Sequence, residues 1–296
     1  MVGWRPDVVE RAELGGTARV VKAGTELRLL CWNLQFGAGR SREFFYDGGD
    51  EVFVPAEDVR ATLAGMAPLV ASADIALLSE VDRGSDRTGR IDELGAFYFP
   101  VTASAPYHRA WVPFPPQRWL GRVEMHLCIG SRVALGEAVR HALPLMNEPW
   151  WRRAFNLRRA MLTTIVKVEG GRPLHVALTH LSAFTRGDDT LTRQVAVLAA
   201  WMGAREARGE RFLLAGDLNL MAPGEHVEGE PSDDAIALLL RRFRRLPTGQ
   251  TYQPFAARPD RTLDWAFASQ DLDVRRCEAL PTELSDHLPI VIDLQL

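Results

Sequence analysis

Apolar segments of strand length recur along the whole of this 296-residue chain. Charged residues interrupt each of them well short of the ~20 apolar residues that a membrane-spanning helix needs. Short apolar runs with polar boundaries are typical of buried or half-buried β-strands, which must pair into sheets. The pattern predicts strands at residues 26–33, 74–80, 123–129, 161–168, 174–181, 211–217, 262–268 and 288–294.

Helical periodicity separates several of these strands. Apolar side chains recur at helical spacing in residues 57–71 and 191–205. Residues 232–245 begin with acids and end with arginines, a polarity that suits the helix dipole, and we interpret the arginines as a solvated helix end. We therefore predict helices in these three segments. Residues 37–54, 104–122, 146–159 and 221–231 are predicted to be irregular and have the length of functional loops.

Strands interspersed with helices and long loops favour an α/β fold in which stacked sheets are flanked by helices. The chain has no internal repeat and no linker that would separate two cores. We expect residues 1–25 to form an N-terminal extension and residues 26–296 to form a single domain, within the usual size range of one large core.

Composition excludes several classes of protein. The formal net charge of −3 argues against a nucleic-acid binder that relies on a broadly basic surface, although a local basic patch stays open. The three cysteines form no metal-type pair, so we expect reduced thiols. The first residues show no apolar leader segment. These features predict a cytoplasmic protein without a transmembrane segment; its oligomeric state stays open.

Polar side chains arrive where the predicted strands end. Asn33 ends the first strand, Glu80 the second and His180 lies in the inward register of a third. Further along, Asp217 and Asn219 flank Leu218 at the end of a strand, and Ser285-Asp286-His287 directly precedes the last one. Each residue alone has an ordinary structural explanation, such as a turn or a surface ion pair. Together they predict a single polar cleft at one edge of the sheets.

This ordered set resembles the endonuclease/exonuclease/phosphatase superfamily. The matching motifs are Cys31-Trp32-Asn33-Leu34-Gln35, Leu78-Ser79-Glu80-Val81-Asp82, Thr179-His180-Leu181, Gly216-Asp217-Leu218-Asn219, Thr262-Leu263-Asp264-Trp265 and Ser285-Asp286-His287. The resemblance implies a four-layer α/β/β/α sandwich of two mostly antiparallel sheets flanked by helices, with residues 26–296 as the catalytic domain. One departure is Ser79 before Glu80, where many nucleases of the superfamily have glutamine.

The resemblance also implies roles for these residues. Asp217 would accept a proton from the attacking water, and Asn219 would hold that water or the phosphate. His287, oriented by Asp264, would bind the phosphoryl oxygen or assist water activation. The deoxyribonuclease-like members further imply that Glu124 partners His180, which would donate to the phosphoryl group or the leaving group. The alternative for Glu124 is an edge-strand carboxylate that faces water.

The candidate metal ligands supply only hard oxygen atoms. They are Asn33, Glu80 and Asp286, and no cysteine or histidine pair has the spacing of a zinc site. A few oxygen ligands completed by water suit Mg²⁺, with Mn²⁺ as its substitute, better than Zn²⁺ or Ca²⁺. The sequence therefore predicts a Mg²⁺-dependent phosphoesterase that uses in-line attack of water.

The substrate is less constrained. Residues 150–159 concentrate arginines and aromatic side chains, and we expect Arg158 or Arg159 to face the cleft and bind phosphate, unless the segment is a loop whose arginines lie in solvent. Acids in residues 221–234 should repel a long polyanion, and no long basic stripe is present. We therefore favour a small phosphodiester, phosphomonoester or lipid headgroup. The alternatives are a DNA or RNA nuclease and a catalytically dead binding module.

Overall fold

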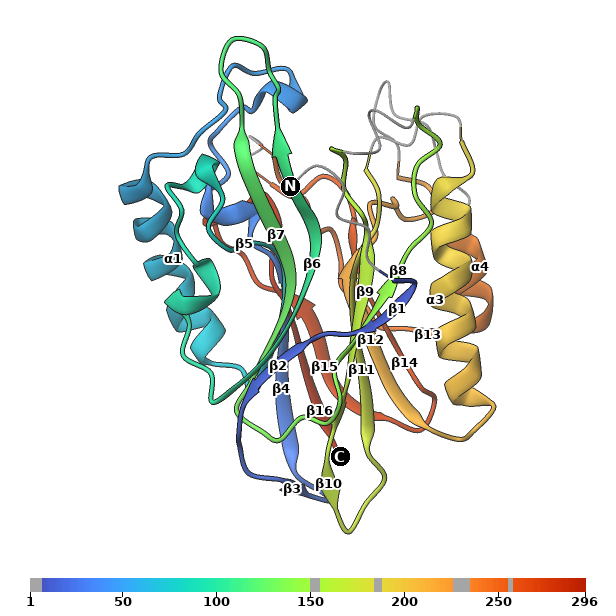
Figure 1. The fold of residues 1–296 in the computed structure, drawn as a ribbon. Coiled ribbons are helices and arrows are strands. Elements are labelled where there is room, and N and C mark those ends of the chain that lie inside the picture. The colour runs from blue at the N-terminus through green and yellow to red at the C-terminus, as the bar shows by residue number, and fades with distance from the viewer. Residues whose placement is uncertain (1–6, 150–154, 184–187, 226–234, 255–257) are drawn as a thin grey trace.

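The computed structural model describes residues 7–149, 155–183, 188–225, 235–254 and 258–296. Two seven-stranded sheets pack face to face (Figure 1). In each sheet one neighbouring pair of strands is parallel and the other described pairs are antiparallel. The prediction of two mostly antiparallel sheets is confirmed.

The first sheet has the strand order β15-β16-β4-β5-β7-β6-β2. Its strands, in chain order, are β2 (Glu13–Gly16), β4 (Glu26–Asn33), β5 (Ile75–Asp82), β6 (Val101–Val112), β7 (Gly121–Ser131), β15 (Asp273–Ala279) and β16 (Ile290–Gln295). Its parallel pair is β4 and β5.

The second sheet has the strand order β1-β8-β9-β11-β12-β14-β13. Its strands are β1 (Val9–Arg11), β8 (Val139–Ala142), β9 (Ala160–Val166), β11 (Leu174–His180), β12 (Arg211–Asp217), β13 (Arg244–Arg245) and β14 (Asp264–Ala268). Its parallel pair is β11 and β12. A separate two-stranded ribbon pairs β3 (Val21–Lys22) with β10 (Val168–Glu169).

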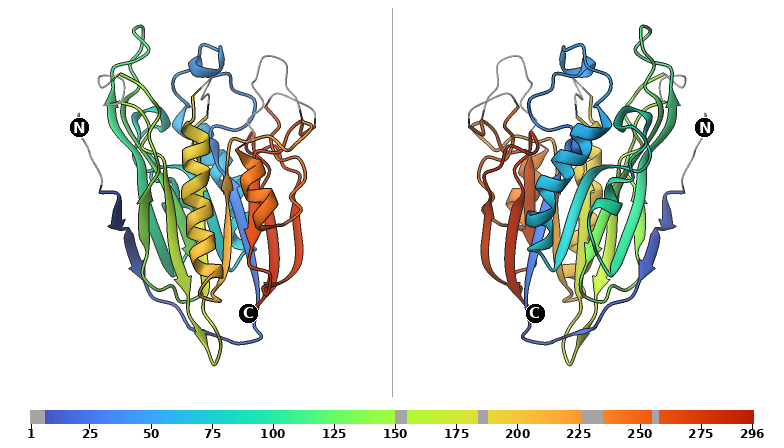
Figure 2. Two further views of the ribbon diagram at one scale, coloured as in Figure 1. Left: turned by 90° about the vertical axis from the view of Figure 1, so that its right-hand side faces the viewer. Right: turned by 90° about the vertical axis from the view of Figure 1, so that its left-hand side faces the viewer.

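Helices cover the outer face of each sheet (Figures 1 and 2). On the first sheet lie α1 (Ala56–Ala71) and the 3₁₀ turns η1 (Gln35–Gly37), η3 (Asp86–Thr88) and η4 (Glu93–Ala96), whereas η2 (Phe45–Asp47) lies beyond the sheet, beside the β6–β7 hairpin. On the second lie α3 (Thr190–Glu206) and α4 (Ile236–Arg242). The four-layer order of helices, sheet, sheet and helices is therefore the predicted one.

Side-chain alternation along the strands builds the three hydrophobic layers. On β4, Leu29 and Cys31 join the core between the sheets, whereas Leu30 and Trp32 pack beneath α1. The second sheet repeats this pattern, with Leu213 in the central core and Leu214 beneath α3 and α4. Because both faces of each sheet are buried, the strands are nearly continuous in hydrophobicity, which is why they stand out in the sequence.

Each parallel pair belongs to a β-α-β unit. In the first sheet the unit is β4–α1–β5, and in the second it is β11–α3–β12. The strands of a parallel pair end at the same edge of their sheet. The two edges meet, because Asn33 at the end of β4 donates a hydrogen bond to Asp217 at the end of β12.

Two structural predictions are wrong. Residues 104–122 were expected to be irregular, but β6 continues to Val112 and β7 begins at Gly121. The inward residues Ala103, Ala105 and Tyr107 do alternate along β6, but Pro106 and His108, on either side of Tyr107, obscure the apolar signal.

The helix predicted over residues 232–245 is shorter. Residues 232–234 lie outside the described part of the chain, and α4 ends at Arg242, where the backbone of Phe243 is extended. Arg244 and Arg245 then form β13 against β14. The Arg244 guanidinium donates to the carbonyl of Leu272, and the Arg245 guanidinium lies over the Trp265 ring. These arginines therefore belong to a strand of the second sheet and not to a helix end.

The segment expected to be an N-terminal extension also contributes strands: β1 pairs with β8, and β2 pairs with β6. Among the described residues, no helix is both long and apolar enough to cross a membrane.

Candidate active site

The first β-α-β unit brings Asn33 and Glu80 to the shared edge. Asn33 is buried, and its Nδ2 donates to Asp217 Oδ2 over 3.0 Å, while its Oδ1 accepts from the Gln35 amide. Glu80 has a left-handed backbone, with φ of 55°, at an irregularity in the pairing of β5 with β7. Non-glycine residues adopt this conformation rarely and at a cost in free energy, which makes the placement of Glu80 a functional signal.

The second β-α-β unit brings His180 and Asp217 side by side, since they are register partners on the parallel strands β11 and β12. His180 Nε2 lies 3.2 Å from Asp217 Oδ2 and 3.9 Å from Glu80 Oε1. Burial lowers the pKa of His180 well below its ordinary value, and the charges of Arg159 and His287 lower it further. His180 is therefore neutral near pH 7 and acts as a hydrogen-bond donor.

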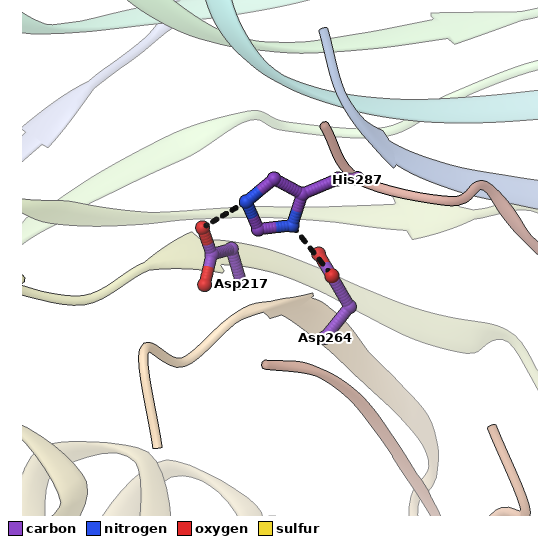
Figure 3. A group of neighbouring side chains, drawn as sticks. All are labelled: Asp217, Asp264 and His287. Carbon is purple, nitrogen blue, oxygen red and sulfur yellow. Dashed lines mark hydrogen bonds and ion pairs between the residues drawn. The ribbon is translucent and has the colours of Figure 1, made fainter. Parts of the chain in front are cut away.

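His287 lies between two carboxylates (Figure 3). Its Nδ1 is 2.7 Å from Asp264 Oδ2, and its Nε2 is 3.6 Å from Asp217 Oδ2. Burial lowers the pKa of His287, but the charges of Asp264, Asp217 and Asp286 outweigh this effect, so the net pKa is well above the ordinary value. His287 is thus an imidazolium near neutral pH, in contact with Asp264 through its Nδ1.

Asp217 is the centre of the group. Burial raises its pKa to about 6, although His287 and the hydrogen bonds from Asn219 and Asn33 oppose this shift. A carboxylate with a pKa just below neutrality is well matched to accept a proton. The amide of Asn219 donates to Asp217 Oδ1, and the Asn219 side chain donates to the carbonyl of Leu181, so Asn219 lies beside Asp217.

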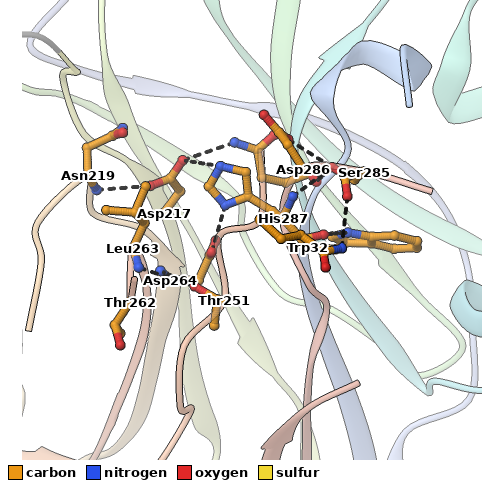
Figure 4. A network of polar contacts seen from close by, with 12 residues as sticks. Trp32, Asp217, Asn219, Thr251, Thr262, Leu263, Asp264, Ser285, Asp286 and His287 are labelled. Atoms are coloured by element: carbon orange, nitrogen blue, oxygen red, sulfur yellow. Dashed lines mark hydrogen bonds and ion pairs between the residues drawn. The ribbon is translucent and has the colours of Figure 1, made fainter. Parts of the chain in front are cut away.

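A wider network holds these groups in place (Figure 4). Trp32 Nε1 donates to the His287 carbonyl over 2.8 Å, and the Ser285 hydroxyl donates to the Asn33 carbonyl over 2.8 Å. The Thr251 hydroxyl accepts from the Asp264 amide over 3.0 Å. The first two bonds join the loop before β16 to β4 of the first sheet, and the third joins the segment around Thr251 to β14 of the second sheet.

Two groups of residues offer metal ligands. Single atoms of Asp217, Asp264 and His287 lie within 4.8 Å of one another, so this buried group could hold a metal ion, which would have to displace the proton that the raised pKa of His287 retains. The predicted ligands Glu80 and Asp286 are close enough for the charge of one to act on the other. Burial raises the pKa of Asp286 to about 7, and the carboxylates of Glu80 and Asp217 add to the rise. Carboxylates that disfavour one another's charge in this way are a donor set that a divalent cation would stabilise.

Glu124 is not the partner of His180, which corrects that prediction. Its carboxylate binds Arg109, Arg122 and His126. Along β7, alternate residues face opposite sides of the sheet, and it is Met125 that joins the central core. Glu124 therefore faces away from His180.

The position beside His180 is occupied by Tyr107 instead. The buried Tyr107 hydroxyl lies 2.6 Å from Met125 Sδ and 3.3 Å from His180 Nδ1. Sequence analysis missed Tyr107 because the segment was expected to be a loop; the alternation of Ala103, Ala105 and Tyr107 was the signal that could have revealed it.

The structure separates the two arginines. Arg159 is buried, its guanidinium carbon lies 5.4 Å from the centre of the Tyr107 ring, and its Nη1 has no hydrogen-bond partner among the described residues. The backbone of Arg158 pairs with Tyr107, and its side chain is partly exposed. The neighbouring residues 150–154 of the predicted phosphate-binding loop lie outside the described residues.

The sequence matches the Endonuclease/Exonuclease/phosphatase family over residues 30–287, from β4 to the loop before β16. This span contains every residue of the site. The chain belongs to the endonuclease/exonuclease/phosphatase family.

Solved structures support the same assignment. An endonuclease/exonuclease/phosphatase from Beutenbergia cavernae matches with a TM-score of 0.63 and 25% identity, covering 92% of this chain and 72% of the other. The human Nocturnin catalytic domain with bound sulfate matches with a TM-score of 0.58 and 18% identity, covering 96% of this chain and 97% of the other. A Staphylococcus aureus beta toxin variant with bound magnesium ions matches with a TM-score of 0.58 and 15% identity, covering 90% of this chain and 99% of the other. The last two likenesses show the family fold alone. No curated protein matches the chain.

Proposed function

We propose that this member of the endonuclease/exonuclease/phosphatase family is a Mg²⁺-dependent phosphoesterase that hydrolyses a phosphodiester or phosphomonoester by in-line attack of water. The observation that carries the proposal is the setting of Asp217. Its carboxylate lies among Asn33, His180 and His287, so proton-accepting, hydrogen-bonding and cationic groups from both sheets meet within a few ångströms.

Asp217 acts as the general base in this proposal. Above pH 6 its carboxylate is ionised and takes a proton from the water that attacks phosphorus. Asn219 lies beside it and orients the water or a phosphate oxygen. The oxygen of the water forms the new bond to phosphorus, and the ester oxygen departs on the opposite side.

The two histidines stabilise the negative charge on the phosphoryl group. His287 remains an imidazolium because Asp264 lies against its Nδ1, and it presents its Nε2 to the centre of the site. His180 is neutral and donates from Nε2 without giving up its proton. This favours phosphoryl binding by His180 over protonation of the leaving group. Preorganised donors of this kind account for much of the rate enhancement in many enzymes.

Glu80, Asp286 and Asn33 are the residues that would hold Mg²⁺, and Mn²⁺ would substitute for it. When bound there, the ion would neutralise a phosphate oxygen and offset the charge on the leaving oxygen. Asn33 would contribute at the edge of that group, since its Oδ1 already accepts a hydrogen bond from Gln35. The raised pKa of Asp286 means that cation binding would release a proton near neutral pH.

Arg159 is the proposed phosphate-binding arginine. Its buried, incompletely paired guanidinium beside Tyr107 suits a group that is completed by an anion. Arg158 would assist from the surface.

The β6–β7 hairpin and its exposed aromatic side chains favour a small ester or a lipid headgroup as substrate. The β6–β7 hairpin extends beyond the end of β5, since Asp82 pairs with Met125 whereas β7 begins at Gly121. Its exposed aromatic side chains are Trp111, Phe114 and Trp119. Trp111 and Trp119 pack edge to face, and Phe114 packs on Phe45. Aromatic tips of this kind suit the interfacial region of a lipid surface better than a polyanionic duplex.

An activity panel tests the proposal. The purified protein is assayed with Mg²⁺ against bis-p-nitrophenyl phosphate, p-nitrophenyl phosphate, phospholipid vesicles and plasmid DNA, with Asp217→Asn as the control. We expect hydrolysis of small esters or lipids with shallow salt dependence. Efficient DNA nicking that collapses between low and physiological salt would instead support the nuclease alternative. If the wild-type protein hydrolyses none of these substrates, the result would support the alternative of a catalytically dead binding module.

A further inference from the structure

A buried ion pair lies at the end of β5, next to the proposed metal ligands. Arg87 in η3 is 6% exposed and Asp82 at the end of β5 is 0% exposed. Two parallel hydrogen bonds join them, from Arg87 Nε to Asp82 Oδ2 over 2.8 Å and from Nη2 to Oδ1 over 2.9 Å. The catalytic mechanism makes no use of this pair.

Arg87 connects the two segments that carry Asn33 and Glu80. Its partner Asp82 follows Glu80 by two residues, just after the left-handed turn of the backbone. On its other side the guanidinium carbon lies 3.6 Å from the centre of the Phe36 ring. Phe36 is itself left-handed, with φ of 41°, and lies in the turn that begins at Asn33. One side chain thus contacts both irregular segments of the site.

The burial of this ion pair does not by itself explain why the fold retains it. A buried arginine–carboxylate pair is often no more stabilising than apolar side chains of the same volume. The residues Gln35, Phe36 and Glu80 each hold a left-handed backbone conformation, which costs free energy in a non-glycine residue. Such strain persists only where the surroundings over-determine the conformation. The Asp82 amide is also held, by Glu93 Oε2 over 2.9 Å.

The charge of Arg87 complements the same segments. Burial lowers its pKa, but the carboxylates of Asp82 and Glu80 act in the opposite direction and keep the pKa above its ordinary value. Arg87 is therefore a permanent cation near three acids, Glu80, Asp82 and Glu93, in a part of the core that would otherwise disfavour ionised carboxylates.

We propose that Arg87 is a positioning residue for the metal site, which holds Glu80 and the Asn33 turn in the geometry that binds Mg²⁺ while touching neither the ion nor the substrate. This inference rests on the proposed function. Residues that orient metal ligands typically change metal affinity by about 10- to 100-fold when they are replaced.

The test compares Arg87→Lys with Arg28→Lys. Arg28 makes the same two-bond pair with Asp293, at 2.7 and 3.0 Å, but on the first half of β4, away from the site edge. Lysine keeps each charge and removes the planar fork. Mg²⁺ affinity is measured by isothermal titration calorimetry without substrate. The melting temperature is measured by differential scanning calorimetry. The Mg²⁺ dependence of kcat is measured with bis-p-nitrophenyl phosphate as the substrate.

We expect Arg87→Lys to weaken Mg²⁺ binding about tenfold and to shift the Mg²⁺ midpoint of activity equally, with most of kcat regained at saturating Mg²⁺. Arg28→Lys should leave both unchanged. If Arg87→Lys lowers only the melting temperature, as a purely structural pair would, the proposal is wrong.

Two further variants keep the result decisive. If Arg87→Lys does not fold, Phe36→Leu removes the stacking partner and should weaken Mg²⁺ binding in the same direction; unchanged affinity would overturn the proposal. Glu80→Gln separates the two hypotheses: if it binds Mg²⁺ like the wild type, the metal assignment fails, whereas an effect of Glu80→Gln without one of Arg87→Lys rejects only the positioning role.

Discussion

The β4–α1–β5 unit and the β11–α3–β12 unit have the same topology, yet they bring different chemistry to the same edge. The first delivers Asn33 and Glu80, which are oxygen donors, and Glu80 keeps a 20% exposed side chain in a left-handed turn. The second delivers His180 and Asp217, which are buried register partners on regular strands. The shared topology brings both sets of side chains to one edge, and local backbone geometry leaves Glu80 partly exposed while His180 and Asp217 are buried.

The largest expected effect comes from replacing Asp217 in the β11–α3–β12 unit, and its response to Mg²⁺ should differ from that of replacing Glu80 in the β4–α1–β5 unit. Asp217→Asn should lower kcat by up to about 10⁴-fold, the upper range for a positioned general base. Additional Mg²⁺ should not restore the activity, because the missing function is proton acceptance. The measurement is kcat across a Mg²⁺ titration, with circular dichroism to verify the fold. Recovery of activity at high Mg²⁺ would instead indicate that Asp217 contributes to metal binding, like the residues of the β4–α1–β5 unit.

Glu80→Gln should lower activity at limiting Mg²⁺ by about 10³-fold, since loss of a metal that stabilises charge removes several kcal/mol from the transition state. Here, in contrast, raising the Mg²⁺ concentration should recover part of the rate. Near wild-type activity at limiting Mg²⁺ would contradict the assignment of Glu80.

The imidazoles should show an intermediate effect. His287→Ala and His180→Ala should each lower kcat by about 10²-fold or more, the usual contribution of a positioned acid–base or phosphate-binding group. Tyr107→Phe should cost less than tenfold, in keeping with one neutral hydrogen bond of about 1 kcal/mol. Glu124→Gln is its matched control and should leave kcat unchanged; an effect larger than that of Tyr107→Phe would restore the rejected Glu124–His180 pair.

The smallest expected effect concerns stability. Folding raises the pKa of Asp286 to about 7 from an unfolded value near 3.8, so the folded metal-free protein binds more protons than the unfolded chain between these pH values. Its stability from this group is therefore present at low pH and is lost as the pH rises from about 4 to 7. Asp286→Asn should raise the melting temperature of the metal-free protein at pH 7 by about 2 °C, and calorimetry with and without Mg²⁺ measures it. No gain, or a gain that persists at pH 4, would contradict the linkage.

Much of the fold was accessible from sequence because both faces of the central strands are buried. Asn33, Glu80, His180 and Asp217 were found since each lies at the end of such a strand. The partner of His180 was not found, because Glu124 lies on the correct strand but on the wrong face, and only three-dimensional register reveals that Met125 and Tyr107 face inward. Arg87 gave no signal at all, since an Asp–Arg pair five residues apart looks like an ordinary surface contact.

The order in which the site is assembled has a consequence for folding. Asp217 bonds to Asn33 across 184 residues, and Trp32 holds the His287 carbonyl across 255. One edge of β4 is paired by β5, but the other is covered only when β16 arrives. Contacts of such long sequence separation slow folding and leave hydrophobic strand edges exposed in the meantime. Until β16 pairs with β4, that central strand keeps one unpaired edge and Trp32 lacks its bond to the His287 carbonyl, so the candidate site is completed only late in folding.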